Sequence, residues 1–223
     1  MPQVISVNVG SPQPTSQGKR IPTGIGKHPV EHVDVRDPGP KHGGEGSGAV
    51  GDFIGDRRHH GGSTQALYAF AREELDAWEA RLGRDLPSGT FGENLTTVGY
   101  DVDASRIGDR WRIGPEVVVV VTGPRIPCST FAARMGERGW VKTFAAHGRS
   151  GAYLAVETPG RITTGDEVAV VSRADHDITV PVALGAFMGD LDAADEVLAA
   201  GVLVPDEHAA LERTVRRRRN VRR

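Results

Sequence analysis

The sequence runs Val117-Val-Val-Val-Val121 and, one residue later, Gly123-Pro-Arg-Ile-Pro-Cys-Ser-Thr-Phe131, and this stretch decides the fold of the chain. Five β-branched residues in a row predict a strand that is buried on both faces. The Gly-Pro pair is expected to end this strand, and Pro127 fixes the backbone just before the thiol of Cys128. The sequence therefore places its single cysteine on a rigid loop at the end of a central strand.

The environment of Cys128 leaves two interpretations open. Arg125 lies three residues away, and a nearby guanidinium favours the thiolate, the form that attacks electrophiles and binds metals. The alternative is a small buried hydrophobic residue, which is a frequent role of free cysteine. The motifs elsewhere in the chain have to decide between the two.

Composition indicates an ordinary globular protein whose 223 residues can bury one substantial core. The formal charge of −2 does not suggest a general binder of polyanions. A single cysteine excludes an intrachain disulfide, a Cys-rich iron–sulfur cluster and a Cys-rich structural zinc site. The chain shows no signal-peptide pattern and no apolar run long enough to span a bilayer, so a cytoplasmic location is expected.

Many short strands separated by turn residues predict a mainly β, α+β body of the barrel or closed-sandwich type. An amphipathic helix is expected over Arg72–Leu82, with Gly83 as its end. Short helices are expected after Cys128. The expected strands or extended segments are Val4–Val9, Ile25–Val30, Val30–Val35, Gln65–Phe70, Ala152–Val156 and Glu167–Val171, with Ile107, Trp111 and Ile113 facing inward.

The character of the sequence changes near Val180. Helical patterns cover Val182–Met188, Ala193–Ala200 and Asp206–Arg217, and they predict a small three-helix appendage. We therefore divide the chain into a β-rich domain, 1–177, and a helical domain with a basic tail, 178–223. The basic run Arg216–Arg219 is interpreted as a solvated chain end, because no nucleic-acid-binding motif accompanies it.

Two loops are expected before the helix at Arg72. The segment Ser11–Lys19 is a polar, proline-containing turn. Residues 36–51 hold six glycines, and this composition predicts a long loop that is either a plain insertion or a lid over a site.

Two further motifs are candidates for ligand binding. In His59-His60-Gly61-Gly62, the imidazole of His60 and the glycine amides suit an anionic or heterocyclic ligand, although a plain surface turn explains the pattern equally well. In Gly92–Thr97, the amide of Asn94 suits the edge of a heterocycle, and the alternative is an Asx turn that leads into a strand.

Taken in order, these motifs resemble the MOSC family, named after the C-terminal domain of molybdenum cofactor sulfurase, and the resemblance covers nearly the whole chain. The C-terminal helices resemble those of the YiiM-like subgroup. The matching segments are Thr23–Lys27, Gly51-Asp52, His60–Gly62, Phe91–Leu95 and Pro124–Cys128.

The resemblance implies a MOSC-type β-barrel with flanking helices that holds a molybdenum cofactor, a molybdenum ion on molybdopterin, and has no need of pyridoxal phosphate. It implies that Cys128 is the metal ligand and the catalytic thiolate. His60, Gly61 and Asn94 match positions that line the cofactor pocket. Lys27, Thr64 and Arg125 are assigned to the pterin phosphate, because cations and hydroxyls suit that group.

The resemblance also implies an oxidoreductase that reduces N-hydroxylated purines, hydroxylamines or amidoximes to amines. The chain has no flavin or nicotinamide fingerprint, so electrons are expected from a separate reductase, and a monomer or homodimer is expected. Three alternatives remain open: a cofactor carrier or sulfur-handling protein, a metal-free thiol enzyme with His60 as base, and a module that binds nucleic acid through its tail.

Overall fold

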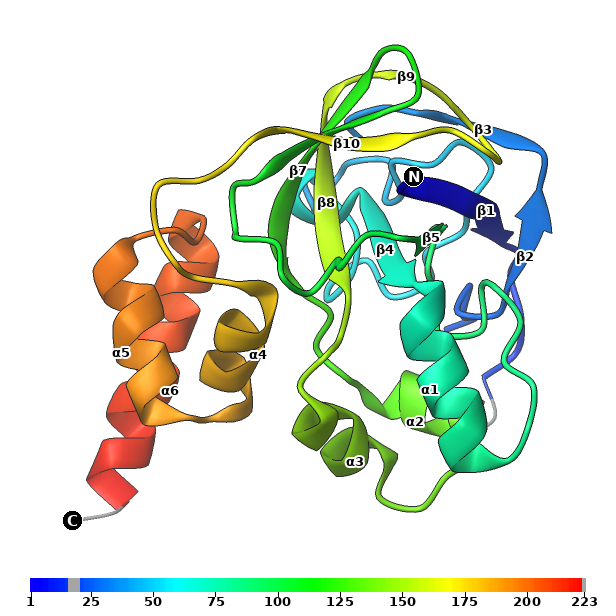
Figure 1. Cartoon of the computed structure of the whole chain (residues 1–223). Helices are drawn as coiled ribbons and strands as arrows, with labels where there is room; N and C mark the ends of the chain where they lie inside the picture. Colours follow the sequence, from blue (N-terminus) through cyan, green and yellow to red (C-terminus); the bar gives the residue numbers. More distant parts are fainter. Residues whose placement is uncertain (16–20, 222–223) are drawn as a thin grey trace.

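The computed structural model describes residues 1–15 and 21–221, in which a curved mixed sheet is flanked by two groups of helices (Figure 1). Eight strands form the main sheet in the order β10-β6-β7-β8-β4-β5-β1-β2, and β3 pairs with β9. The strands are β1 (Gln3–Gly10), β2 (Lys27–Val30), β3 (His32–Val35), β4 (Leu67–Ala71), β5 (Leu95–Val98), β6 (Arg110–Ile113), β7 (Val117–Pro124), β8 (Ala152–Thr158), β9 (Gly160–Thr163) and β10 (Val168–Ser172).

The helices fall into two groups (Figure 1). One group gathers beneath one end of the sheet, and the other stands to its side. The first comprises α1 (Arg72–Leu82), α2 (Ser129–Met135) and α3 (Trp140–His147), and the second α4 (Val180–Met188), α5 (Leu191–Ala200) and α6 (Pro205–Val221). A short 3-10 helix, η1 (Ser63–Gln65), precedes β4. The expectation of an α+β fold is confirmed.

The main sheet curls until its two ends approach each other. Val168 N–H donates to the carbonyl of Pro2, Val4 N–H donates to that of Asp166, and Gln3 bridges Glu167. These contacts link β1 to the β10 side of the sheet through an isolated bridge. The strands thus form a barrel-like sheet, in which an isolated bridge instead of a full ladder joins β1 to the segment at the start of β10.

The valine strand differs from its prediction. In β7, Val117, Val119 and Val121 are buried, whereas Val118 and Val120 are partly exposed. The strand also continues through the Gly-Pro pair to Pro124, because it keeps pairing with β8 as far as Ala152. The prediction of burial on both faces and of a break at Gly123 is therefore wrong.

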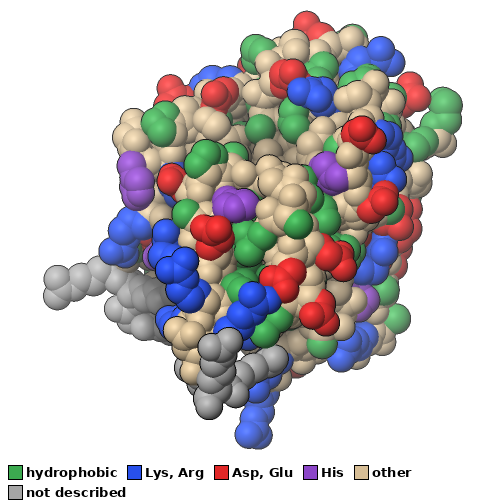
Figure 2. Space-filling view, turned by 90° about the vertical axis from the view of Figure 1, so that its left-hand side faces the viewer, with side chains coloured by type: hydrophobic (Ala, Val, Ile, Leu, Met, Phe, Trp, Pro, Cys, Tyr) green, Lys and Arg blue, Asp and Glu red, His purple; other side chains and the backbone are tan. Residues whose placement is uncertain are grey.

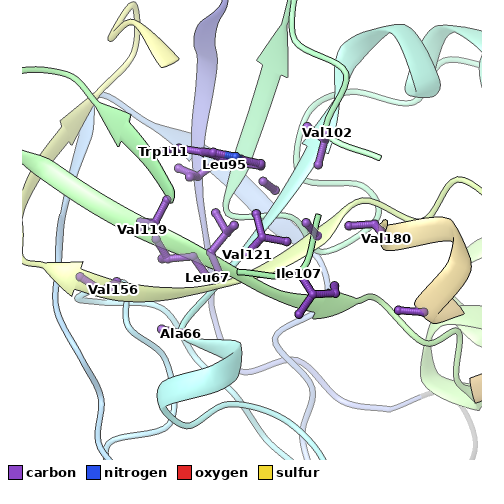
Figure 3. Close-up of a cluster of buried hydrophobic side chains, with 14 of the residues drawn as sticks. Ala66, Leu67, Leu95, Val102, Ile107, Trp111, Val119, Val121, Val156 and Val180 are labelled. Carbon is purple, nitrogen blue, oxygen red and sulfur yellow. The ribbon is translucent and has the colours of Figure 1, made fainter. Parts of the chain in front are cut away.

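The buried faces of the strands enclose the main core. Val119 and Val121 of β7 point into a cluster that includes Trp111 of β6 (Figure 3). The inward orientation of Trp111 and Ile113 is confirmed, since both are fully buried. Val180, at the start of α4, belongs to the same cluster, so the core runs from the sheet into the C-terminal helices. The division of the chain at residue 177 stays a prediction.

Beneath the sheet lies a second core made of aromatic side chains. It joins β4 to α1, α2 and α3, and its members include Phe91, Phe131, Trp78, Trp140 and Phe144. Helix α1 has the predicted bounds, and the Gly83 N–H closes it by donating to the carbonyl of Glu79 at 2.8 Å. The cysteine loop enters this second core, which fixes the start of α2.

Several local predictions need correction. The extended segment predicted over Gln65–Phe70 begins at Leu67, because Gln65 belongs to η1. Strand β9 was not predicted, and α6 continues beyond Arg217 through the basic run. The turn predicted at Ser11–Lys19 and the end of the basic tail lie partly outside the described residues. Within the described part of the chain, every helix is too short or too polar to cross a bilayer.

Candidate functional site

A cavity of about 510 Å³ opens beside the cysteine loop, and its size is typical of a small-molecule site. It brings together segments that are far apart in the sequence, from the loop before β2 to β8. Six of the seven residues predicted for the site line it: Lys27, His60, Gly61, Asn94, Arg125 and Cys128. Thr64 is absent from the lining, and its backbone carbonyl accepts a hydrogen bond from the hydroxyl of Thr122.

Cys128 is the residue immediately before α2 and is only partly buried. Burial raises the pKa of its thiol, but a hydrogen bond from His60, the charge of Arg125 and the backbone N–H of Phe131 outweigh burial and lower the pKa to about 6. The thiolate is therefore the main form at neutral pH. Of the two interpretations left open by the sequence, the structure favours the reactive thiol.

Arg125 is a buried cation with an exposed fraction of 5%. Its guanidinium lies 3.8 Å from the ring centroid of Phe131, and Nη1 donates to the carbonyl of Ile126 at 3.3 Å. No carboxylate among residues 1–15 and 21–221 lies within ion-pair distance of it. Its charge acts instead on the neighbouring thiolate of Cys128. A buried cation that lines a cavity and has no carboxylate partner suits an anionic ligand at this point.

Lys27, the other predicted phosphate ligand, has a different environment. Its ammonium pairs with Asp52, and both side chains are buried. Asp52 also accepts hydrogen bonds from Gly10 N–H at 2.7 Å, Ser47 Oγ at 2.7 Å and Asn94 Nδ2 at 3.1 Å. The charge of Lys27 is thus already neutralised within the fold.

The side chain of Asn94 is likewise engaged within the fold. Its Oδ1 accepts from Tyr68 N–H at 3.1 Å, and its Nδ2 donates to the carbonyl of Asn8 at 3.2 Å as well as to Asp52. The amide therefore joins β1, β4 and β5 at the floor of the cavity. In this arrangement it positions Asp52, and it does not offer a free edge to a ligand.

The turn that carries His60 rests on the glycine-rich loop. Gly62 N–H donates to the carbonyl of Gly46 at 2.9 Å, and Ser63 N–H donates to that of Gly39 at 2.8 Å. Gly61 has a φ of 81°, and a Cβ at this position would lie 2.5 Å from the carbonyl oxygen of Gly46. These contacts give residues 36–51 a role that was not predicted, the support of the His60 turn, and the choice between a plain insertion and a lid stays a prediction.

Sequence reasoning missed three groups of the cavity. Asp52 was noted only as part of a motif, although it is the acceptor for four donors. Gln65 lines the cavity, and its Oε1 is buried without a hydrogen-bond partner. Tyr153 also lines the cavity, and burial raises the pKa of its phenol. The last two stand alone in the sequence and carry no motif that could have identified them.

Among the described residues, the cavity thus combines the reactive thiolate of Cys128, the Arg125 cation without a carboxylate partner and the unpaired amide oxygen of Gln65 with apolar side chains. In the described ranges, no group of three or more His, Cys, Asp or Glu side chains is placed to hold a metal ion. A metal bound here would take Cys128 as its protein ligand, and the remaining ligands would have to come from the bound molecule. A soft thiolate suits a metal that is presented in this way.

Comparison with known proteins agrees with the motifs. The sequence model of the MOSC domain family matches residues 56–169 of this chain. The uncharacterized protein YflK of Bacillus subtilis (strain 168) is 34% identical over 181 residues, which cover 81% of this chain and 78% of YflK. A protein named reductase from Gibberella moniliformis is 28% identical over 117 residues, which cover 51% of this chain and 21% of that protein.

The fold of the whole chain is also found among solved structures. The crystal structure of YiiM from Geobacillus stearothermophilus superimposes with a TM-score of 0.74 at 26% identity, covering 96% of this chain and all of that one. The likeness includes the C-terminal helices, since nearly the full length is matched. The chain therefore belongs to the MOSC domain family and is a YiiM-like member of it.

Proposed function

We propose that this protein binds a molybdenum–pterin cofactor through Cys128 and reduces N-hydroxylated compounds to amines. The observation that carries the proposal is the meeting of a thiolate, at a pKa of about 6, with the buried cation of Arg125, which has no carboxylate partner among the described residues, in one cavity. A molybdenum–pterin cofactor presents a metal, which suits a thiolate, and a phosphate, which suits a cation. The relative named reductase supports an oxidoreductase.

Each residue of the cavity then has a defined task. Cys128 would hold the metal, and His60 keeps its sulfur deprotonated by hydrogen bonding. Arg125 would hold the phosphate, while Lys27 stays paired with Asp52 and maintains the cavity floor. Bound in this way, the cofactor would supply the two-electron oxygen-transfer chemistry, and the protein binds and orients it.

The overall reaction fixes what else is needed. Converting R–NHOH to R–NH₂ and water takes two electrons and two protons, with cleavage of the N–O bond. The electrons must come from another molecule, since the chain has no second redox group in its sequence motifs. The apolar part of the cavity, with Tyr153 at its wall, would contact the apolar part of the substrate.

The test is to produce the wild type and Cys128→Ser in a host that makes the cofactor, and to measure molybdenum and released pterin per chain. Near-stoichiometric metal in the wild type that falls in the variant supports the proposal. Turnover of a hydroxylamine with a reduced viologen then separates a reductase from a carrier. Absence of both metal and pterin, beside a loaded control enzyme, contradicts the proposal.

One contact also fits a second function. The hydrogen bond between His60 and Cys128 is the arrangement that a metal-free thiol enzyme requires, with His60 as its base. That enzyme would be active without molybdenum and would be inactivated by alkylation of Cys128. Activity of the cofactor-free protein that iodoacetamide abolishes would favour this function over the reductase.

A further inference from the structure

A chain of aromatic rings connects the site with the protein surface. Cys128 packs against the edge of the aromatic core, and its neighbour Phe131 belongs to that core. The ring centroid of Phe131 lies 5.4 Å from that of Trp140, which lies 4.7 Å from that of Trp78. These rings are fully buried and in mutual contact, so they form a continuous packed path away from the cavity.

The far end of this path lies beneath a surface hollow between α1 and α3. The guanidinium of Arg81 lies 5.0 Å from the ring centroid of Trp78, and the ring centroid of His147 lies 4.8 Å from it. Arg81 and His147 both line the hollow, together with Lys142. The path from the cysteine loop to the hollow therefore passes through the rings of Phe131, Trp140 and Trp78.

The surface around the hollow is basic. Five exposed cations lie on the adjoining ends of α1 and α2 and on the start of α3, and we call this surface the basic face: Arg81, Arg84, Arg134, Arg138 and Lys142. Arg84 pairs with Glu137 at 3.5 Å, a contact that also joins α1 to α2. Within the described residues, the other four cations have no carboxylate at ion-pair distance. The nearby acids are Asp85 and Glu137 in sequence, and Glu74, which lies 2.7 Å from His147 and also pairs with Arg149, so positive charge dominates.

We propose that the basic face is the docking surface for an acidic redox protein that delivers electrons to the site at Cys128. This inference rests on the proposed function, which needs two electrons from outside the chain. Opposite charges speed and orient the encounter of two proteins, and weak redox encounters need only a small interface. Packed rings also give an electron a path with fewer gaps than a route through solvent.

The second basic surface of the molecule lacks these features and serves as a control. Helix α6 exposes Arg213, Arg216 and Arg217, whereas Arg219 is paired with Asp195. Neither α5 nor α6 contains an aromatic residue apart from His208. On the face that includes these helices, cations and acids are interspersed (Figure 2). Charge alone would make α6 equivalent to the basic face, and the aromatic path distinguishes the two.

The experiment compares two triple variants of the cofactor-loaded protein with equal loss of charge. The first is Arg81→Gln/Arg138→Gln/Lys142→Gln on the basic face, and the second is Arg213→Gln/Arg216→Gln/Arg217→Gln on α6. Hydroxylamine reduction is measured with a reduced viologen and with a reduced, acidic flavodoxin as the protein donor. Binding of the oxidised flavodoxin to each protein is titrated as a readout that does not depend on turnover, and thermal unfolding checks that both variants are folded.

In the first variant, the proposal expects Kd for flavodoxin to rise about tenfold and kcat/KM to fall about tenfold, with a weaker dependence on salt. In the second variant, both should change by less than about twofold. Viologen-driven turnover stays the same in both. Equal losses in the two variants, no loss in the first, or a wild type that accepts electrons from viologen but not from flavodoxin would overturn the inference. A wild type that viologen cannot drive would refute the proposed function itself, and this inference with it.

Discussion

The two walls of the cavity differ in how their polar groups are engaged. On the wall formed by Lys27, Asp52 and Asn94, the charged and amide groups bond to one another and to the backbone. On the wall formed by Cys128 and Arg125, the cation has no carboxylate partner among the described residues, and both it and the thiolate line the cavity. We call the first the closed wall and the second the open wall. The difference shows that residues of the same family motifs can line one cavity and still have separate tasks. Those of the closed wall stabilise the fold, and those of the open wall are available to bind a ligand.

The largest effect is expected from removing the centre of the closed wall. Asp52→Ala takes away the acceptor of four donors and leaves the buried Lys27 charge unpaired, so we expect a loss of roughly 3–5 kcal/mol of unfolding free energy. Guanidinium unfolding measures it. Asp56→Ala, at the rim of the same cavity and paired with the exposed Arg58, should cost less than about 1 kcal/mol. Equal costs would mean that the closed wall is not structural.

The turn beside the open wall should be the next most sensitive. Gly61→Ala combines a positive φ with a close approach of the new Cβ to Gly46, and we expect it to cost about 1–3 kcal/mol. Gly43→Ala is its matched control, because Gly43 has a similar φ of 85° but no atom within 4 Å of its Cβ position. Unfolding of the two variants separates backbone strain from the clash. A Gly61→Ala cost no larger than that of Gly43→Ala would show that the turn can shift away from the loop.

The thiol of the open wall is expected to titrate near its lowered pKa. In cofactor-free protein, the rate of iodoacetamide alkylation of Cys128 should rise with an apparent pKa of about 6, because the thiolate is the reactive form. His60→Ala should move this pKa upward, toward the ordinary value of a thiol. Cys128 is the single cysteine, so Cys128→Ser provides a blank without labelling. An unchanged pH dependence of alkylation in His60→Ala would show that His60 does not lower the pKa of Cys128.

The smallest effect on stability is expected from Arg125. Arg125→Gln leaves no carboxylate behind in the described part of the protein, so we expect the unfolding free energy to change by no more than about 1 kcal/mol, the worth of its contact with Phe131. The same guanidinium experiment measures it, and the alkylation profile should show a raised pKa of Cys128. A loss comparable with that of Asp52→Ala would mean that Arg125 is part of the scaffold, and the distinction between the walls would fail.

The sequence predicts those elements whose cause is local. Helix α1 has the predicted bounds because Leu75 and Trp78 repeat on one face and Gly83 can adopt the left-handed conformation that ends a helix. The valine run predicts β7, but identical residues cannot show which of them face inward. Strand β9 was missed because Gly160 follows Pro159, a pair typical of a turn, while its pairing with β3 depends on residues more than a hundred positions away.

The same limit applies to the site. The motifs identify six residues that line the cavity, since each motif is local. They do not separate the closed wall from the open one, because the donors to Asp52 come from positions 10, 27, 47 and 94. Thr64 was chosen because a hydroxyl suits a phosphate, but it belongs to η1 and does not line the cavity. Only the folded chain shows which polar groups are already satisfied.

The link between the two ends of the main sheet bears on solubility. An uncovered strand edge offers free N–H and C=O groups to a second molecule and promotes edge-to-edge aggregation. Here the carbonyl of Pro2 accepts from Val168 N–H, and Val4 N–H donates to the carbonyl of Asp166. The exposed side chain of Val171 lies on the same strand as Val168. Removal of the first four residues would therefore expose part of this edge. We expect such a chain to self-associate under conditions in which it is still folded.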